Sequence, residues 1–497
     1  MVRTSMVPML LVCCGVAAQT PAAGEAKRLS LRDAIQTSLQ NNLAVDIAQQ
    51  SREVTRAQIL INEGPFDWNF SATAQAQQRK TPFSGTAPGG AEVHSTGTVK
   101  SRSLTTDLNK NFPWGGNLDL NYAPAYSSSS NPNTSGSVPF PYSGAFSATY
   151  NQSLLQGFGY KVSTAPLVIA RKGADSADYT FQLAIINLVA DTETKYWAVV
   201  AAQRNLANFQ LSLQLAQKQL NDNNIRLQVG TMAPLDVTAA EAQVAQAEQS
   251  IISGQAALDN AKDALIRALY PNAERPAGLE LTDDPTLSHT QIDEAAAVKM
   301  ALERRVELKA AHISKDISDL QLSVARNKVL PQLNAFVAYN GASDNYGAIG
   351  PVNSDLAGLN YPGYTVGLKF AVPIQNRAAR GGLAVARANL RGSELSLRDL
   401  ELSITLAVRQ AVRNIDATEK GVKAAEKTRY LKEKTLEAEQ KKFENGMSTN
   451  FNVLQIMTDL SNARAAETQA QISYANAVTA LEQAMGNLLE ARNFSIK

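Results

Sequence analysis

Cysteine and histidine are nearly absent from this chain. Its two cysteines, Cys13 and Cys14, lie within the first fifteen of 497 residues, so the rest of the chain holds neither a disulfide framework nor a thiolate metal site. The three histidines, His94, His289 and His312, lie far apart in sequence and lack metal-ligand spacing. We therefore expect no metal site.

Catalytic motifs are absent as well. We find neither a nucleophile elbow of the Gly-x-Ser-x-Gly type nor a phosphate-binding Gly-x-x-x-x-Gly-Lys-Ser/Thr loop. Carboxylates are plentiful, but no two of them are set apart as an acid–base pair. Charged residues make up 19% of the chain and the formal net charge is +2, so no strong field points to nucleic acid or an acidic partner. We expect no enzymatic activity and no cofactor.

Long hydrophobic runs are also missing. No run approaches the roughly 18 apolar residues of a membrane helix. Residues 1–18 instead have the pattern of a signal peptide, with Arg3, a short apolar core and small residues before Ala18. The residues before Cys14 faintly suggest a lipoprotein box, but Cys13 fits that position poorly and ordinary cleavage is favoured. We expect an exported protein without a helical anchor.

The chain contains a long internal repeat. Residues 226–237 return at 442–453, an offset of 216 residues that also aligns Leu265 with Leu481. The segment from about 165 to 270 repeats without a gap. One added residue would rotate every later side chain of a helix by about 100°, so a gap-free repeat indicates packed helices. Two such copies imply a quasi-symmetric assembly.

A short helix is expected to open each half. The first begins at the capping pattern Ser30-Leu31-Arg32-Asp33 and reaches about Ile61. The second runs from about 290 to 329, at an offset of 263 residues. We divide the chain into a signal peptide (1–18), a first structural repeat (24–285) and a second structural repeat (286–497).

A far longer helix is expected later in each half, at about 164–228 and 380–444. Each would span roughly 100 Å at about 1.5 Å per residue. After Gly230 and Gly446 the chain turns back into shorter helices that end near 270 and 489. Helices of this length indicate coiled-coil-like packing. Their Gln, Asn, Ser and Thr content suits a wall with water on both sides.

Between the short and long helices, apolar and polar residues alternate. The alternating segments are 66–77, 146–154, 333–339 and 364–372. Aromatic residues that include Phe66, Trp68, Phe146 and Tyr150 lie near the segment ends. Amphipathic strands of about ten residues with aromatic ends are typical of a membrane β-barrel. A half-buried soluble sheet fits any single strand about as well, but the signal peptide and the missing globular core favour the barrel.

The number of strands requires an oligomer. Two further strands are expected at 103–112 and 117–126, joined by a tight turn. Four to six strands cannot close a bacterial membrane barrel, which needs about eight, and an open strand edge in lipid is not tolerated. The protomer must therefore share its barrel with copies of itself.

Taken together, these features resemble the outer-membrane efflux protein family of TolC-like ducts. The resemblance covers nearly the whole mature chain and rests on features that occur in order at the repeat spacing: Leu29-Ser30-Leu31-Arg32-Asp33-Ala34-Ile35 with Asn41-Asn42, Leu330-Pro331-Gln332-Leu333, Val229-Gly230-Thr231 with Asp236-Val237, and Asn445-Gly446-Met447 with Asn452-Val453-Leu454.

The resemblance implies a mainly α fold with a membrane β-barrel. In a homotrimer, each protomer would give four strands to a twelve-stranded barrel in the outer membrane. This barrel would continue into a long α-helical barrel of coiled-coil-like hairpins in the periplasm. The resemblance also implies a passive exit duct of a tripartite efflux or type I secretion system.

In such a duct, an inner-membrane transporter passes cargo through a periplasmic adaptor, which docks on the helix tips. The tips are expected at Val229, Gly230, Thr231, Asn445, Gly446 and Met447. They would rest in a narrowed state and dilate as the helices uncoil. Each glycine also suits the C′ position of a long helix, where a positive φ favours glycine. A compact turn of this kind is what an adaptor would grip.

The chain departs from the family pattern at residues 103–126 and at the entrance. The hairpin at 103–126 either projects as an extracellular extension or enlarges the barrel to eighteen strands. The extension is favoured, because four strands match four helical columns.

Some family members carry a ring of aspartates after the second glycine turn, where this chain has Asn452 and Gln455. An amide ring binds cations weakly at most. Asp236 is a further gate candidate, although it also suits the first turn of its helix, where it complements the macrodipole.

The competing interpretation is a periplasmic adaptor or a secreted coiled-coil interaction protein. An adaptor usually has one helical hairpin between two halves of a small β domain, whereas this chain has two hairpins and no such domain. A coiled-coil filament would not need alternating strands with aromatic ends. The duct is therefore the favoured function.

Overall fold

The computed structural model describes residues 27–86, 89–130, 140–271, 279–285 and 292–494. The expected signal peptide and Cys14 lie outside the described residues. The chain divides into two compact units. The helical unit comprises the described residues of 1–45, 185–294 and 408–497, and the sheet unit comprises those of 46–184 and 295–407. Among the described helices, none carries an apolar stretch sufficient to cross a lipid bilayer.

The two expected long helices are present, and both contribute to both units. They are α4 (Ala165–Gln228) and α9 (Arg377–Glu444), with 64 and 68 residues. At about 1.5 Å per residue, each is roughly 100 Å long. The shorter helices that follow them are α5 (Pro234–Leu269) and α10 (Asn450–Met485).

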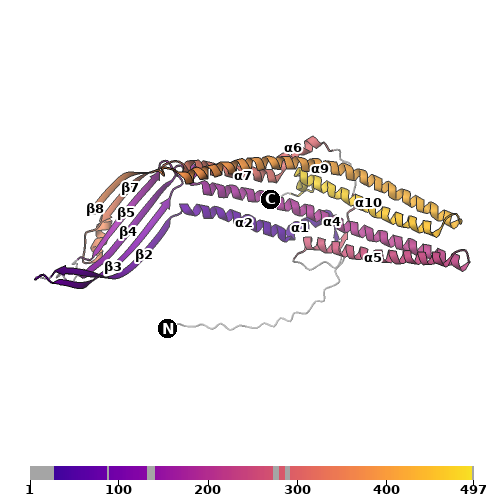
Figure 1. Ribbon diagram of the computed structural model, residues 1–497, viewed down its shortest axis with the longest axis horizontal. Helices are drawn as coiled ribbons and strands as arrows, with labels where there is room; N and C mark the ends of the chain where they lie inside the picture. Colours follow the sequence, from indigo (N-terminus) through magenta and orange to yellow (C-terminus); the bar gives the residue numbers. More distant parts are fainter. Residues whose placement is uncertain (1–26, 87–88, 131–139, 272–278, 286–291, 495–497) are drawn as a thin grey trace, which may run out of the picture. The chain divides into compact units, whose positions relative to one another are not determined.

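The sheet unit contains one antiparallel sheet of six strands (Figure 1). The strands are β2 (Asn69–Thr86), β3 (Glu92–Asn111), β4 (Gly116–Ser130), β5 (Tyr142–Ser153), β7 (Gln332–Ala342) and β8 (Tyr361–Ala371). Their order in the sheet is β2-β3-β4-β5-β7-β8, so β2 and β8 are its two edges. All six expected strands are present.

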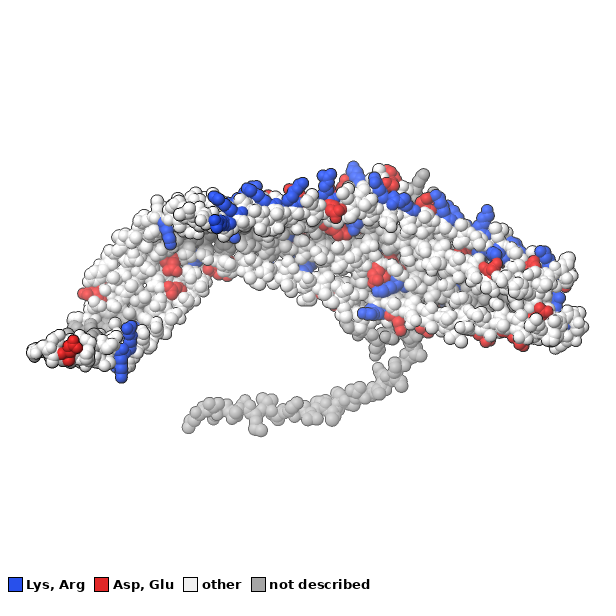
Figure 2. Space-filling model, viewed as in Figure 1, with Lys and Arg blue, Asp and Glu red and all other residues white. Residues whose placement is uncertain are grey.

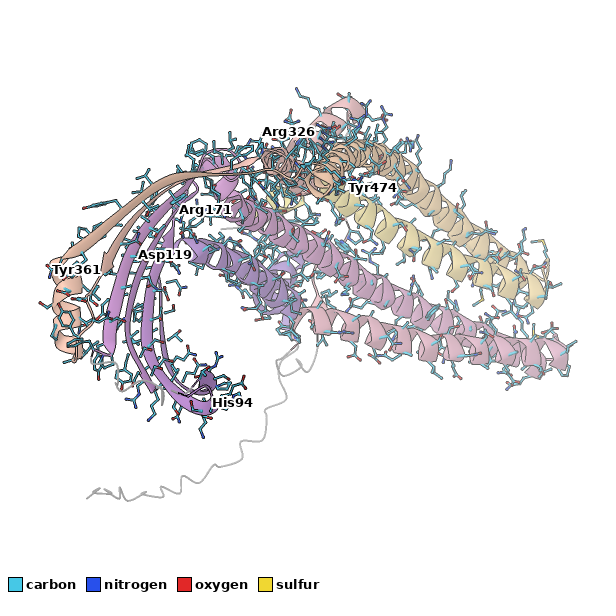
Figure 3. All side chains as sticks on the ribbon, turned by 60° about the vertical axis from the view of Figure 1, so that its left-hand side comes forward. His94, Asp119, Arg171, Arg326, Tyr361 and Tyr474 are labelled. Atoms are coloured by element: carbon cyan, nitrogen blue, oxygen red, sulfur yellow. The ribbon has the colours of Figure 1, made fainter. Side chains whose placement is uncertain are left out.

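The favoured placement of the hairpin at 103–126 as an extension is wrong. Its strands β3 and β4 lie inside the sheet, between β2 and β5. The physical reason is that their apolar side chains continue the apolar face of the neighbouring strands, as the pairing of Leu108 with both Phe70 and Leu120 shows. The part that extends is the far end of β2 and β3, which stay paired beyond the last β3–β4 partner, Thr98. Figure 3 shows His94 near the end of this two-stranded ribbon.

Hydrogen bonds and ion pairs show the order in which the helices of the sheet unit lie side by side. Helix α2 (Leu43–Glu63) packs beside α4, where Arg52 donates to Asp178 and Arg171 lies 3.0 Å from Glu63. Helix α7 (Val306–Lys328) lies on the other side of α4 and is joined to it by the 2.9 Å pair of Lys172 and Asp316. A hydrogen bond between Ser318 and Ser393 then joins α7 to α9. The row is therefore α2, α4, α7, α9.

Smaller elements connect these helices and strands. A 3-10 turn (Gly64–Phe66) precedes β2, and α3 (Tyr160–Ser163) precedes α4. Helix α8 (Ile349–Gly358) lies between β7 and β8, and its Val352 and Leu356 pack over Gly144 of β5. At Gly144 a Cβ atom would approach both side chains to 2.8 Å, so glycine permits this close packing.

Each expected short helix is broken once, which corrects the prediction of two continuous helices. The pieces are α1 (Leu31–Asn41) with α2, and α6 (Glu294–Arg304) with α7. The breaks fall at Asn42 and Arg305, which have extended backbones and match at the offset of 263. The Asn42 side chain accepts from the Ala44 N–H and donates to the Ala268 carbonyl, both at 2.8 Å. It therefore starts the next helix and holds the break against α5.

Two helix pairs form the core of the helical unit. Leu206 of α4 packs with Leu258 and Leu265 of α5, and Ile415 of α9 packs with Tyr474 of α10, which Figure 3 labels. A third cluster joins the two pairs and contains Ala216, Leu436, Phe443, Val453, Leu454, Met457 and Leu460. Strand β1 (Lys27–Leu29) pairs in parallel with β6 (Leu279–Leu281) at the edge of this core.

The C-terminal end is fixed by a buried carboxylate. Glu193 is fully buried on α4, where Arg492 donates to it at 2.6 and 3.0 Å and Thr479 donates at 2.5 Å. A buried charge is tolerated only when it is paired and hydrogen-bonded. This contact therefore ties α4 and α10 to the segment that follows α11 (Leu488–Ala491).

Candidate functional site

The two glycine turns of the helical unit have the same geometry. Gly230 and Gly446 have φ of 77° and 71°, a region that favours glycine. The N–H of Gly230 donates to Leu227 and that of Thr231 to Arg226, and the same two bonds recur at Gly446 and Met447. This pattern is a Schellman motif, which satisfies the last carbonyls of a helix. The predicted tip residues therefore form two matched helix ends.

Apolar side chains project from these turns. Val229, Leu235, Met447 and Phe451 are between 71% and 79% exposed. The nearby polar groups are satisfied locally, because Thr231 donates to the Arg226 carbonyl and Asn445 to the Lys441 carbonyl. The tips thus offer exposed apolar side chains on a backbone with its own hydrogen bonds.

The predicted gate residues are not joined to one another by any hydrogen bond or ion pair in the described part of the chain. Asn452 is exposed, and its N–H donates to the Thr449 hydroxyl at the start of α10. Gln455 is exposed one turn later and donates to Asp459 at 3.2 Å. Asp236 lies in the first turn of α5, as expected, and its carbonyl accepts from Asn450 at 2.9 Å.

A carboxylate near the predicted gate residues escaped the sequence reasoning. Asp459 accepts from Lys432 of α9 at 2.8 Å and from Gln455. The Lys432 ammonium and the Gln455 amide hold the pKa of Asp459 below its ordinary value. Its position, one turn beyond Gln455, is the signal that could have identified it. The carboxylate is therefore already neutralised by a lysine of its own chain.

A buried amide cluster joins the two hairpins at the tips and was also missed. Gln219 and Asn223 of α4 both donate to the side-chain oxygen of Asn450, at 3.1 and 2.9 Å. Beside them, Arg226 donates to the Phe443 carbonyl and its guanidinium lies 4.5 Å from the centre of the Phe443 ring. The spacing of four residues between Gln219 and Asn223 places both on one helix face. That spacing was the available signal.

The sheet has one apolar and one polar face. One row of paired residues crosses all six strands on the apolar face: Phe70, Leu108, Leu120, Ala148, Tyr339 and Tyr364. The next row, on the opposite face, is Ser71, Asp107, Asn121, Ser147, Asn340 and Gly363. Figure 3 labels Asp119, another residue of the polar face, on β4. Such alternation is typical of strands that face lipid on one side and water on the other.

Basic and aromatic side chains bound the apolar face along β3. Lys110 lies 5.0 Å from the ring centre of Trp68 and 5.9 Å from that of Phe112. Toward the other end of the strand, Arg102 lies 5.9 Å from the ring centre of Tyr126. The two cations are eight residues apart on the strand, which corresponds to about 26 Å. This length is close to the apolar band of about 25 Å in membrane barrels.

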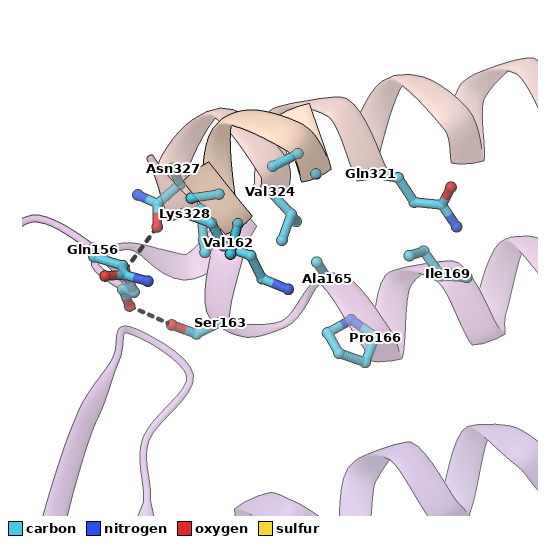
Figure 4. A pocket seen from close by; sticks show the side chains of 15 residues that line it. Gln156, Val162, Ser163, Ala165, Pro166, Ile169, Gln321, Val324, Asn327 and Lys328 are labelled. Carbon is cyan, nitrogen blue, oxygen red and sulfur yellow. Dashed lines mark hydrogen bonds between the residues drawn. The ribbon is translucent and has the colours of Figure 1, made fainter. Parts of the chain in front are cut away.

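A cavity of about 810 Å³ lies where strands and helices of the sheet unit meet (Figure 4). Small and apolar residues from the start of α4, the end of α7 and the start of α9 line most of it. Asn327 accepts from the Gly157 N–H at 2.7 Å, and Ser163 donates to the Gly157 carbonyl. These bonds fix the connection between β5 and α3.

Known proteins resemble this chain in sequence and in fold. A family model described as outer membrane efflux protein matches residues 116–269 and 297–487. Outer membrane protein TolC of Escherichia coli (strain K12) is 26% identical over 330 residues, which cover 65% of this chain and 66% of that protein. Outer membrane protein TolC of Vibrio cholerae is 26% identical over 343 residues, covering 69% and 76%. The match thus spans just under two thirds of the E. coli relative.

Solved structures share the fold at low sequence identity. The Campylobacter jejuni CmeC outer membrane channel has a TM-score of 0.65 at 15% identity, covering 92% of this chain and 86% of that chain. The outer membrane protein VceC from Vibrio cholerae has the same TM-score and identity, covering 92% and 96%. The matched family is one of outer membrane efflux proteins and not of enzymes, which confirms the expected lack of enzymatic activity. Because the family model matches more than half of the residues, the chain belongs to the outer membrane efflux protein family.

Proposed function

We propose that the protein is a passive exit duct of the bacterial outer membrane, working in a tripartite efflux or type I secretion system. Cargo would reach it from an inner-membrane transporter through a periplasmic adaptor. Family membership supports a role in efflux in general. The observation that carries the proposal is the six-stranded sheet, which combines one apolar face, one polar face and two free edges.

The free edges support a homotrimer. An open edge in lipid leaves backbone N–H and C=O groups without partners, so β2 and β8 must each pair with another strand. In a ring of three copies, β8 of one protomer would pair with β2 of the next. Six strands per protomer would then give eighteen strands, in place of the twelve implied by the family resemblance.

The repeat offsets locate the extra strands. The short helices match at an offset of 263 residues and the long helices at 216, so the first half carries 47 additional residues between them. Strands β3 and β4 lie in this interval, and the family model begins only at residue 116, the start of β4. Because barrel diameter grows roughly linearly with strand number, eighteen strands would make the exit about one and a half times as wide as twelve.

The helical unit would stand in the periplasm and present its tips to the adaptor. The exposed Val229, Leu235, Met447 and Phe451 supply the apolar contacts that such docking needs. In the candidate gate at Asp236, Asn452 and Gln455, the two amides are neutral and the nearby Asp459 is paired with Lys432. Asp236 would therefore supply most of the negative charge of the gate.

Single-channel recording in planar bilayers tests the duct. Purified protein that runs as a heat-sensitive trimer should conduct ions steadily, and trimers that never conduct would overturn the proposal.

Electron cryomicroscopy of the same trimers should show a barrel of eighteen strands. A barrel of twelve strands would contradict the widened exit. Fractionation tests the competing adaptor or filament, because either of these would be extracted from cells without detergent.

A further inference from the structure

Helix α8 lies on the apolar face of the sheet, over the end of β5 that is far from α3 and α4. Its Val352 and Leu356 pack over Gly144 of β5, where a Cβ atom would approach each of these side chains to 2.8 Å. Gly144 and Phe146 lie on the same face of β5, because they are two residues apart. The helix is therefore docked on the face that carries the apolar row, close to Tyr361 in Figure 3.

A hydrogen bond to the neighbouring strand confirms this face. The Tyr122 hydroxyl of β4 donates to the Asn353 side chain of α8 at 2.7 Å. Tyr122 pairs with Phe146, so both rings lie on the apolar face. Helix α8 thus covers β4 and β5, which are the two central strands of the sheet.

The exposed surface of α8 is uncharged. Asp355 is the only charged residue between Asp344 and Lys369. It is 7% exposed, and its carboxylate accepts from the Tyr346 hydroxyl at 2.7 Å and from the Asn360 amide at 2.8 Å. The exposed residues of α8 and of its C-cap are small, apolar or neutral: Ile349, Gly350, Pro351, Asn353, Ser354, Ala357, Gly358 and Leu359.

Other exposed helix surfaces of this chain are rich in charge. Figure 2 shows Lys and Arg gathered along the edge that α9 forms in that view. A charged side chain in lipid is costly, whereas one in water is not. The uncharged surface of α8 therefore suits lipid better than it suits water.

The strand register places α8 just inside the outer limit of the apolar band. Arg102, which marks this limit, pairs with Tyr126, and Tyr126 pairs with Tyr142. The Tyr126 and Tyr142 rings meet edge to face at 5.0 Å, and tyrosine is enriched where membrane and water meet. Gly144 lies two residues inside the limit, or about 7 Å.

The end of α8 presents an apolar side chain at a backbone position that favours glycine. Leu359 has a φ of 54°, in the left-handed region that a leucine rarely adopts, and is 46% exposed. Helix α10 ends with the same conformation at a glycine, Gly486. A leucine in this position adds an apolar side chain to the exposed surface, which is what a contact with lipid needs.

We propose that α8 is an interfacial helix, which lies on the outside of the barrel in the outer leaflet of the membrane. This proposal rests on the proposed function, because it takes the apolar face of the sheet to be the face toward lipid. Interfacial helices lie in the plane of the membrane, at the boundary between headgroups and acyl chains. The level of Gly144 in the apolar band corresponds to this boundary.

Lipid is the occupant that the sheet order favours over a second copy of the chain. In the proposed trimer, copies meet at the edge strands β2 and β8. Strands β4 and β5 are two positions away from the nearer edge, or about 10 Å at about 4.8 Å per strand. The surface of α8 therefore lies over the middle of the protomer's own sheet, away from the junctions between copies.

Nitroxide labels on single cysteines test this position in purified trimers, reconstituted into vesicles of phosphatidylethanolamine and phosphatidylglycerol. The probe is Ser354→Cys, because Ser354 is exposed and lies on the opposite side of α8 from Val352 and Leu356. Collisions with oxygen, which dissolves in lipid, are compared with collisions with a nickel chelate, which stays in water. We expect oxygen to relax the Ser354 label more strongly than the nickel chelate does.

Two matched controls come from β3. Leu104 and Thr105 are adjacent, so they lie on opposite faces of the strand, and the strand registers place Leu104 level with Gly144. The label at Leu104→Cys should respond mainly to oxygen and the label at Thr105→Cys mainly to the nickel chelate. The unmodified protein, treated in the same way, reports any signal from Cys13 or Cys14.

Displacing the helix gives a second measurement. Gly144→Val should push α8 away from the sheet, because the added side chain collides with Val352 and Leu356. The Ser354 label should then become more mobile, which sharpens its spectral lines. Ala145→Val is the matched control, because it places the same side chain one residue later on the exposed polar face. The mobility of the label should stay unchanged in this control.

The outcomes separate this proposal from the proposed function. A Ser354 label that responds mainly to the nickel chelate, beside a Leu104 label that responds mainly to oxygen, would overturn the interfacial helix and leave the duct standing. Equal label mobility in Gly144→Val and Ala145→Val would overturn the docking of α8 on the apolar face. If Gly144→Val does not assemble, the labels in the otherwise unmodified chain decide. A Leu104 label that responds mainly to the nickel chelate would instead overturn the lipid face of the proposed duct.

Discussion

The side-chain amide of Asn223 donates a 2.9 Å hydrogen bond to the side-chain oxygen of Asn450, and both residues are buried. Asn450 also accepts from Gln219 and donates to the carbonyl of Asp236. One asparagine thus joins three helices, because these partners lie on α4 and α5 while Asn450 begins α10.

Asn450→Ala should loosen the helix tips. The substitution removes the acceptor that the buried amides of Gln219 and Asn223 share, so each loses one of its hydrogen bonds. An unsatisfied buried group costs about 1–3 kcal/mol. We expect faster hydrogen exchange in residues 219–236 and 443–453. The matched control is Asn445→Ala, which removes an exposed amide that bonds only to its own helix. Equal exchange in the two variants would show that the cluster does not hold the hairpins together.

Leu235→Asp should weaken adaptor binding without disturbing the fold. Leu235 is 79% exposed, so its loss removes contact area for a partner while little packing within the chain changes. Cross-linking to the adaptor in cells measures the effect. Thr238→Asp is the control, because it adds the same charge one turn later on an exposed polar residue. Adaptor cross-linking that stays at the wild-type level in Leu235→Asp would remove this tip from the docking surface.

The sequence predicted individual helices and strands better than it predicted which of them lie next to one another. The local residue pattern on either side of a tight turn predicted β3 and β4, because such a pattern depends only on residues close together in the chain. It did not reveal that both strands enter the sheet, because strand order depends on partners far away in the chain, such as β2 and β5.

In the helical unit, too, local features were predicted and contacts between distant residues were not. The glycine turns followed from local backbone chemistry, since a positive φ at Gly230 and Gly446 depends on the turn itself. The break at Asn42 did not, because the Ala268 carbonyl that holds it lies more than 200 residues away. The gate candidates were chosen by position, whereas the pairing of Asp459 with Lys432 needed the packing of α9 on α10.

Acid should weaken the contact between α9 and α10 at Asp459. Because Lys432 lowers the pKa of Asp459, the contact is fully present above the ordinary Asp pKa of about 3.9. It is lost as the pH falls through the lower folded value. Hydrogen exchange near residues 432 and 459 should differ between wild type and Asp459→Asn at pH 7, and this difference should vanish in strong acid. A difference that does not change with pH would contradict the role of this carboxylate.

Arginine on the apolar face of the sheet should prevent stable assembly, whereas arginine on the polar face should be tolerated. Leu120 and Ala123 lie on opposite faces of β4, because they are an odd number of residues apart. An arginine that faces lipid costs about 2–4 kcal/mol near the bilayer midplane, and one that faces a water-filled lumen avoids that cost. We therefore expect Leu120→Arg to reduce the yield and heat stability of the trimer. Ala123→Arg should keep the trimer and shift its ion selectivity toward anions, measured as the reversal potential in a salt gradient. The opposite result, with Leu120→Arg stable and Ala123→Arg unstable, would mean that the apolar face does not face lipid.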